Sequence, residues 1–368
     1  MGANRRLVSI IVAVTVLFAA IDVVWLPFST ISLDPRNFGH LAKAASAALA
    51  AYLIGRLVLY RLRDERSWAA GAMRWAADRL IVLVVVSTIF LPLGFVSAIF
   101  MYLASATQVP LVDGKLAALD AALGFDWRSF LETTNGSPPV AWALVIAYHS
   151  LTPQVIALFL LYSAARRADK ALEFIALLAV SSVFTGLLMA MFPAAGAYAY
   201  FDPPPETFDA FTAQAGMWHY SELLRLRSGD NFNLFVGNAQ GLVTFPSYHT
   251  ALGIMVVYSL RSVRWAAGPI AVLNAVMIIG TLPEGGHHLS DVIAGAMVAV
   301  VSILAVRAVV GTVPTGAGCD DTLGNGQNKK GRGKPDLPHH LRSTPVHPWS
   351  SRRCDCSIAS VRDRQMTN

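Results

Sequence analysis

The chain carries a succession of apolar runs, each about the length of a membrane crossing, separated by polar segments. Because a transmembrane helix needs roughly 20 apolar residues, the runs predict about eight transmembrane helices. These predicted spans lie near residues 7–27, 41–60, 80–103, 140–163, 171–191, 247–263, 266–283 and 288–310. Only 14% of the residues are charged, whereas a soluble protein of this size carries about 25%. The sequence therefore predicts an all-α integral membrane protein, a polytopic helix bundle.

Basic residues orient the predicted spans. Arg5 and Arg6 precede the first span, and further clusters occupy every second connection: residues 56–79, Arg166, Arg167, Lys170, Arg261 and Arg264. By the positive-inside rule these connections and both termini face the cytoplasm. We predict a bacterial plasma membrane as the location. The net charge of +6 comes without an aromatic-interleaved basic patch, so no nucleic-acid partner is expected.

Composition divides the chain into three parts. We predict N-terminal transmembrane helices over 1–135, a catalytic membrane domain over 136–311 and a disordered basic cytoplasmic tail over 312–368. The tail is rich in Gly, Pro, Ser, Lys and Arg, and it cannot bury enough apolar surface to offset its ordering entropy. It also holds all three cysteines, Cys319, Cys354 and Cys356. Their spacing from nearby histidines fits no standard zinc site, and no disulfide framework is apparent.

The residues that predict chemistry lie within 244–295. His249 occurs in TFPSYHTALG and His287, 38 residues later, in GGHHLSDVIAG. This separation is about two crossings with a tight turn, which would return both histidines to the same, outer face. Asp291 follows His287 by four residues, so the two side chains share a helix face. Ionisable groups at membrane depth indicate function by default.

These residue types predict phosphoryl chemistry. A histidine whose Nδ1 proton is held by a carboxylate can attack phosphorus with its other nitrogen, which assigns these roles to His287 and Asp291. His249, across the phosphate, can protonate the departing oxygen as general acid. This chemistry needs no metal, and we predict neither metal nor cofactor.

Other polar residues are candidates for binding the phosphate. Ser247, Tyr248 and the backbone N–H groups at the start of their helix favour an anion. Arg225 and Arg227 can add bidentate bonds, although a solvated or headgroup-facing edge explains these two arginines equally well. They lie in a long connection that we expect to cap the site. For His149, we expect a packed, hydrogen-bonded role.

The motifs carry a family resemblance. PSYH followed by HHLSD resembles the second and third motifs of the phosphatidic-acid phosphatase type 2 superfamily, which read PSGH and then SR, five residues, His, three residues, Asp. The resemblance implies that His249 is the acid, His287 the nucleophile and Asp291 its partner. GLVTFPSYHTAL, the HHxxD form and the Phe-Pro pair at 192–193 look most like the inositol phosphorylceramide synthase-like branch. The resemblance to the superfamily covers about residues 170–310.

The chain also departs from the superfamily pattern. Gly280 and Thr281 stand where the pattern has Ser-Arg, so that phosphate-binding arginine is missing, and no first motif is visible. His288 is a rival to His287 because it lies three residues before Asp291. Spacing and motif alignment favour His287.

Several functions remain compatible with these motifs. We expect a phosphotransferase that acts on a lipid-linked phosphate at the outer leaflet, with an inositol or sugar acceptor. With water as acceptor, the same site makes a lipid phosphate phosphatase. A transporter whose histidines relay protons would place ionisable residues along the whole path, whereas here they gather at the outer ends. A haem or metal site at His249 and His287 would leave the PSY and the i+4 Asp unexplained. The oligomeric state is not predicted.

Overall fold

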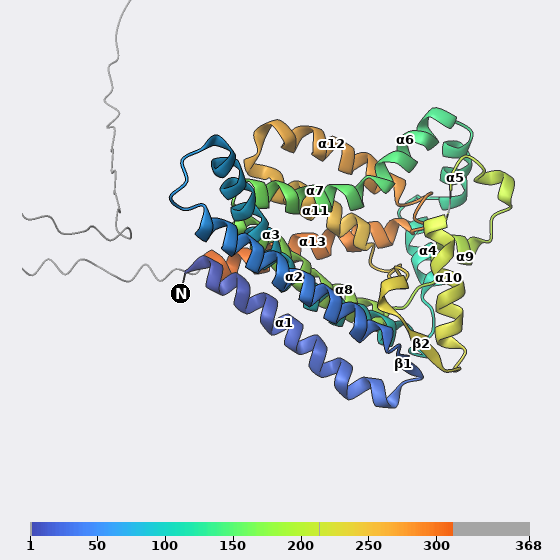
Figure 1. The fold of residues 1–368 in the computed structure, drawn as a ribbon. Coiled ribbons are helices and arrows are strands. Elements are labelled where there is room, and N and C mark those ends of the chain that lie inside the picture. The colour runs from blue at the N-terminus through green and yellow to red at the C-terminus, as the bar shows by residue number, and fades with distance from the viewer. Residues whose placement is uncertain (1, 213, 312–368) are drawn as a thin grey trace, which may run out of the picture. The chain divides into compact units, whose positions relative to one another are not determined.

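The computed structural model describes residues 2–212 and 214–311, and most of them are helical. Figure 1 shows the described residues as a bundle of long helices with shorter helices gathered at one end. Five helices are long and apolar enough to cross a membrane: α1 (Ala3–Trp25, continued by the 3₁₀ turn Leu26–Phe28), α2 (Arg36–Arg61), α3 (Trp68–Ser105), α8 (Ala168–Met191) and α13 (Leu289–Gly311). The predicted polytopic helix bundle is confirmed. The tail 312–368 lies outside the described residues, so its predicted disorder stays a prediction.

The remaining predicted spans coincide with shorter or bent helices. α6 (Pro138–His149) and α7 (Leu151–Ala164) meet at a bend of 41° and together have the length of one crossing. α11 (Tyr248–Ser259) and α12 (Arg264–Gly280) are joined by the 3₁₀ turn Leu260–Ser262. At about 1.5 Å per residue, neither α11 nor α12 reaches across a hydrocarbon core of about 30 Å. We therefore count five full-length helices and one bent pair among the described residues.

Helix α8 occupies the centre of the bundle. It is apolar on every face, which is typical of a helix that is buried all round, and Phe174, Ile175 and Leu177 are fully buried. Helices α1, α3, α11 and α13 all pack against it. Helix α2 contrasts with it, because α2 packs mainly against α3 and exposes most of its apolar residues. An exposed apolar face of this kind suits contact with lipid.

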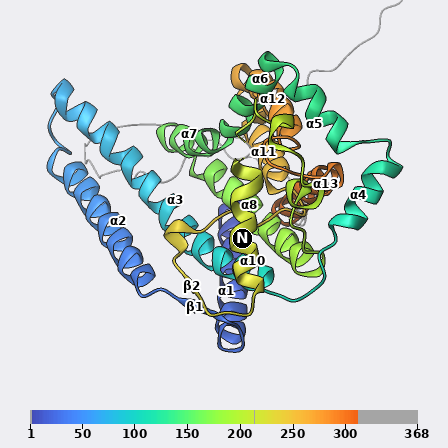
Figure 2. The ribbon, with the colours of Figure 1, turned by 90° about the vertical axis from the view of Figure 1, so that its right-hand side faces the viewer.

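The shorter elements gather at the end of the bundle away from the N-terminus of α1, which we call the distal end (Figure 1; Figure 2 looks onto it). They are α4 (Asp113–Ala122), α5 (Trp127–Asn135), α9 (Ala197–Phe201), α10 (Gln214–Arg227) and the 3₁₀ turns Pro205–Thr207 and Val236–Asn238. Strand β1 (Ile31–Leu33) pairs in parallel with β2 (Phe232–Leu234). This pairing ties the α1–α2 connection to the segment that precedes α11.

Candidate active site

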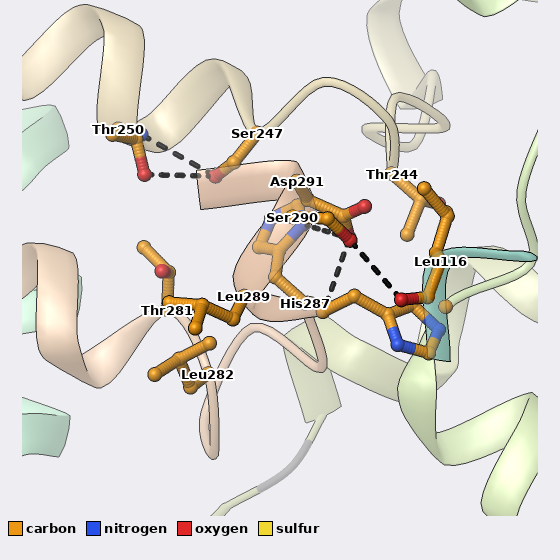
Figure 3. A network of polar contacts seen from close by, with 12 residues as sticks. Leu116, Thr244, Ser247, Thr250, Thr281, Leu282, His287, Leu289, Ser290 and Asp291 are labelled. Atoms are coloured by element: carbon orange, nitrogen blue, oxygen red, sulfur yellow. Dashed lines mark hydrogen bonds and ion pairs between the residues drawn. The ribbon is translucent and has the colours of Figure 1, made fainter. Parts of the chain in front are cut away.

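The first turns of α11 and α13 lie against each other at the distal end (Figure 3). The backbone N–H of Ser247, the N-cap of α11, donates to the Asp291 carbonyl oxygen at 3.0 Å. Gly295 permits this approach, because a Cβ there would lie 2.2 Å from the Ser247 carbonyl oxygen. The two segments that carry the predicted catalytic residues therefore meet through backbone contact.

His287 and Asp291 form the predicted pair. His287 Nδ1 lies 3.3 Å from Asp291 Oδ2, and both side chains are buried. The same carboxylate oxygen accepts the backbone N–H of His288 at 2.8 Å, which fixes its orientation. Gly285 makes the preceding turn tight, because a Cβ there would meet the Thr281 carbonyl oxygen at 2.7 Å. With Nδ1 facing the carboxylate, Nε2 is the nitrogen directed away from it.

His249 completes the predicted trio. Its ring centroid lies 6.5 Å from that of His287, and its ring stacks on Tyr148 at 4.7 Å with an interplanar angle of 23°. In a reactive complex the distance from the nucleophile to phosphorus is about 3 to 3.5 Å. The distance from a general acid to the oxygen that it protonates is about 3 Å. With ring centroids 6.5 Å apart, the two imidazoles are separate but close enough for both to contact one bound phosphate. The arrangement therefore suits one phosphate between two imidazoles.

The predicted phosphate-binding residues are placed less favourably. The fully buried Ser247 hydroxyl caps its own helix by accepting from the Thr250 backbone N–H at 3.4 Å, and it also accepts from the Thr250 hydroxyl at 3.1 Å. The Tyr248 hydroxyl lies 3.3 Å from that of Ser181 on α8. Both side chains thus serve contacts within the bundle.

Arg225 and Arg227 lie at the end of α10, where their guanidinium groups make other contacts. Arg227 donates to the carbonyl oxygens of Thr107 and Val109, at 2.5 and 2.7 Å. Arg225 lies over the Phe232 ring, 5.2 Å from its centroid. Since neither of these contacts involves a catalytic histidine, the assignment of the two arginines to the phosphate stays a prediction.

The neighbouring His288 is engaged on both sides of its ring. Nε2 lies 3.6 Å from an Asp113 oxygen and Nδ1 lies 3.6 Å from an Asp120 oxygen, and the ring is fully buried. These are ion-pair distances, slightly long for hydrogen bonds. An imidazole enclosed in this way has no nitrogen left for a substrate, so the geometry favours His287 as the reacting histidine.

Asp113 and Asp120 also accept hydrogen bonds from backbone N–H groups. We call the cluster of Asp113, His288 and Asp120 the clamp. Asp113 accepts the N–H groups of Ala195 and Gly196. Asp120 accepts those of Leu289 and Ser290, in the first turn of α13. Neither aspartate belongs to the motifs that predict the chemistry of the chain. Their one signal was a spacing of seven residues, which puts them on one face of α4.

Electrostatics in the clamp favour charged groups. Burial opposes ionisation of Asp113 and Asp120, but the charge of His288 and the backbone N–H groups outweigh it, so the pKa of each carboxyl lies below its ordinary value. Burial likewise disfavours the imidazolium of His288, but the two carboxylates outweigh that effect and raise its pKa to about 9. The clamp is therefore an Asp⁻–His⁺–Asp⁻ arrangement at neutral pH.

The clamp predicts a loss of stability at high pH. The pKa of His288 rises from 6.5 in the unfolded chain to about 9 in the fold. The stabilisation is therefore complete below pH 6.5 and is lost as the pH rises through 9. At about 1.4 kcal/mol per pH unit of pKa shift, this stabilisation amounts to about 3 kcal/mol.

The apparent Tm in detergent, measured at one scan rate and salt concentration, should fall between pH 7 and 10. His288→Gln should lower Tm at pH 7 and flatten this dependence, whereas parallel curves for the two proteins would contradict the assignment.

A second histidine–carboxylate pair lies beside the trio. His149 Nε2 is 2.9 Å from Glu284 Oε1, and Glu284 is fully buried. Glu284 also accepts the backbone N–H of Thr212 at 3.0 Å and the hydroxyl of the same residue. The hydrogen bond expected for His149 is present, but its side chain is 51% exposed rather than packed. No local sequence pattern indicates this role of Glu284, because its partners are 72 and 135 residues away.

The acidic and histidine side chains of the site do not form a metal centre among the residues that the structure describes. Among residues 2–212 and 214–311, no group of three or more His, Cys, Asp or Glu side chains has a geometry that could hold a metal ion. The histidines here pair with single carboxylates or lie between two of them.

Comparison with known proteins places this geometry in a family. A family model described as the PAP2 superfamily matches residues 114–305, a range that includes Asp120, both predicted catalytic histidines and Asp291. No curated protein and no solved structure matches the chain. The family match spans more than half of the chain and contains the two helix starts that form the site. The chain belongs to the PAP2 superfamily, whose members act as phosphatases or phosphotransferases on phosphate substrates such as lipid phosphates.

Proposed function

We propose that the protein is a lipid phosphotransferase that works through a phosphohistidine on His287. The observation that carries the proposal is the joint geometry of the trio. Asp291 faces His287 Nδ1 at 3.3 Å, and the His249 ring lies 6.5 Å from the His287 ring. A nucleophile oriented by a carboxylate and a second imidazole across the gap are the two groups that stepwise phosphoryl transfer requires.

The reaction has two balanced steps. In the first, Nε2 of His287 attacks phosphorus, the bond from phosphorus to the lipid oxygen breaks, and His249 gives that oxygen its proton. Asp291 holds the Nδ1 proton and stabilises the charge that develops on the ring. In the second, an acceptor hydroxyl attacks phosphorus, its proton passes to His249, and the N–P bond breaks. Both histidines return to their starting states.

The motif variant supports the choice of acceptor in this proposal. The FPSYH and HHxxD forms resemble the inositol phosphorylceramide synthase-like branch, which favours an inositol or sugar hydroxyl as acceptor. With water in the same place, the enzyme would be a lipid phosphate phosphatase.

We also propose that the site opens at the outer leaflet and that both termini are cytoplasmic. Arg6, at the start of α1, donates to the Val309 carbonyl oxygen near the end of α13 at 2.9 Å. The two helix ends therefore lie together, and the histidines are at the distal end. The basic connections predict that the shared end is cytoplasmic. Residues 136–311 then form the catalytic part and 1–135 an N-terminal part whose helix α4 contributes the clamp.

A turnover assay tests the proposed function. Purified full-length protein in detergent is given a panel of lipid phosphates and phospholipids, with chelator present, and release of phosphate or head group is measured with and without inositol. We expect metal-independent turnover that inositol accelerates, with formation of a phosphoinositol product. Release of free phosphate at a rate independent of inositol or sugars would instead identify a phosphatase. Turnover that stops when chelator is added would contradict the mechanism.

A further inference from the structure

We propose that His149, held by Glu284, is a phosphate-binding residue that supplies the site with positive charge. The inference rests on the proposed function, because it assigns a ligand contact to the same site. It concerns a side chain on α6, outside the two motifs.

The surroundings of His287 are rich in negative charge. Asp291 faces its ring and Glu284 lies three residues before it, while two further carboxylates surround the adjacent His288. A phosphate monoester is also an anion, with a charge of about −1.5 to −2 at neutral pH. Binding it next to these carboxylates requires a cation or free N–H donors.

The backbone donors of α13 are already committed. The N–H groups of Leu289 and Ser290 bond to Asp120, and that of His288 bonds to Asp291. The first turn of α13 therefore cannot serve as the phosphate cradle. The guanidinium of Arg227 is likewise bonded to the carbonyls of Thr107 and Val109.

Helix α6 fills the space beside Gly280 and Thr281. A Cβ at Gly280 would lie 2.8 Å from the Leu144 carbonyl oxygen on α6, so the two backbones are in contact. The buried Thr281 hydroxyl turns back to donate to the Ile278 carbonyl oxygen. No positive side chain projects from these positions. The helix packed against them carries His149 at its C-terminal end.

The position of His149 suits a ligand contact. Its Nε2 is 2.9 Å from Glu284, while half of its side chain is exposed, and Nδ1 has no hydrogen-bond partner among the described residues. The Tyr148 ring contacts both histidines, with its centroid 5.3 Å from that of His149 and 4.7 Å from that of His249. His149 is therefore one ring contact away from His249, through Tyr148.

Glu284 explains how an imidazolium can be held at this place. Its buried carboxylate is fixed by the backbone N–H and hydroxyl of Thr212, and a buried carboxylate needs a paired charge. A doubly protonated ring donates Nε2–H to Glu284 and Nδ1–H to a phosphate oxygen. Glu284 and Tyr148 are the titratable groups that face this ring, and His249 is the other partner of Tyr148's ring contacts. Glu284 is accordingly a positioning residue and His149 the binding residue.

Binding of orthophosphate tests the inference without relying on turnover. The apparent Kd is taken from the phosphate-dependent rise in Tm of the full-length protein in detergent. His149→Gln keeps a polar side chain but removes the charge, and it should raise the apparent Kd about tenfold or more, since a charge-assisted hydrogen bond is lost. His149→Arg should restore binding.

Glu284→Gln should also weaken phosphate binding, because the His149 ring loses its charged partner. The matched control is His40→Gln, an exposed histidine on α2 beside Phe235, which should bind like the wild type.

The outcomes separate this inference from the proposed function. Equal apparent Kd values for the wild type and His149→Gln, or no stabilisation of the wild type by phosphate, would overturn the role of His149 even if lipid turnover is observed. Phosphate binding that depends on His149, in a protein that turns over no lipid phosphate, would support the inference and leave the proposed function without support.

Discussion

Replacing His287 by glutamine is expected to abolish turnover, with a loss of at least about 10⁴-fold in kcat. The imidazole supplies the nucleophile, and removing a residue in that role commonly costs several orders of magnitude. Asp291→Asn should be intermediate, with a loss of about 10²- to 10⁴-fold, because the ring keeps its place but loses the carboxylate that selects its tautomer. Phosphate release from the best lipid substrate, measured under single-turnover conditions, gives both values.

A fold control accompanies these two variants. Asp291 is fully buried and accepts from His288, so the elution volume in size exclusion and the Tm of each variant must be measured beside its activity. His40→Gln, far from the site along the chain and exposed, should retain wild-type turnover. If a folded His287→Gln protein turned over substrate within tenfold of the wild type, the nucleophile would have to be another residue.

Replacing Gly295 by alanine is expected to have the second largest effect, although the side chain touches no substrate. The added Cβ would lie 2.2 Å from the Ser247 carbonyl oxygen, so α11 and α13 must move apart. That movement separates His249 from His287, and a misplacement of about 1 Å can cost about 10²-fold in rate. We expect kcat to fall about 100-fold and stability to fall by about 1 to 3 kcal/mol.

Gly94→Ala is the matched control for this substitution. Gly94 also lies inside a long helix, α3, and a Cβ there meets nothing within 4 Å. Alanine in a helix interior is favoured over glycine by about 0.5 to 1 kcal/mol, so this variant should be as stable as the wild type or more so, and fully active. Equal activities for Gly94→Ala and Gly295→Ala would show that the approach of α11 to α13 does not set the catalytic distance.

The sequence predicted those features that depend on local periodicity. The length of the apolar runs predicted the bundle, and the four-residue spacing of His287 and Asp291 predicted their contact. The 38 residues between His249 and His287 predicted their return to one end, although α11 and α12 are too short to be full crossings. A bend such as that between α6 and α7 depends on packing against neighbouring helices, which apolar content alone does not reveal.

Contacts between distant segments could not be predicted in this way. Asp120 accepts from Leu289, in the first turn of α13, although 169 positions separate the two residues in the sequence. Glu284 and His149, which also interact, are 135 positions apart. Nothing in a single sequence pairs such residues, because each pairing is decided by how whole helices pack. The arginines illustrate the same limit, since the sequence could not predict that Arg227 bonds to the carbonyl oxygens of Thr107 and Val109. Its assignment to the phosphate stays a prediction.

The most direct test of the central claim is the chemical trapping of the phosphoenzyme. Wild-type protein is mixed rapidly with a radiolabelled lipid phosphate and quenched in alkali, and the labelled peptide is located by mass spectrometry. The account predicts a phosphoryl group that is labile in acid and stable in alkali, formed on His287 and absent from His287→Gln. A label on His249 or His288, or rapid turnover with no labelled protein at any quench time, would contradict it.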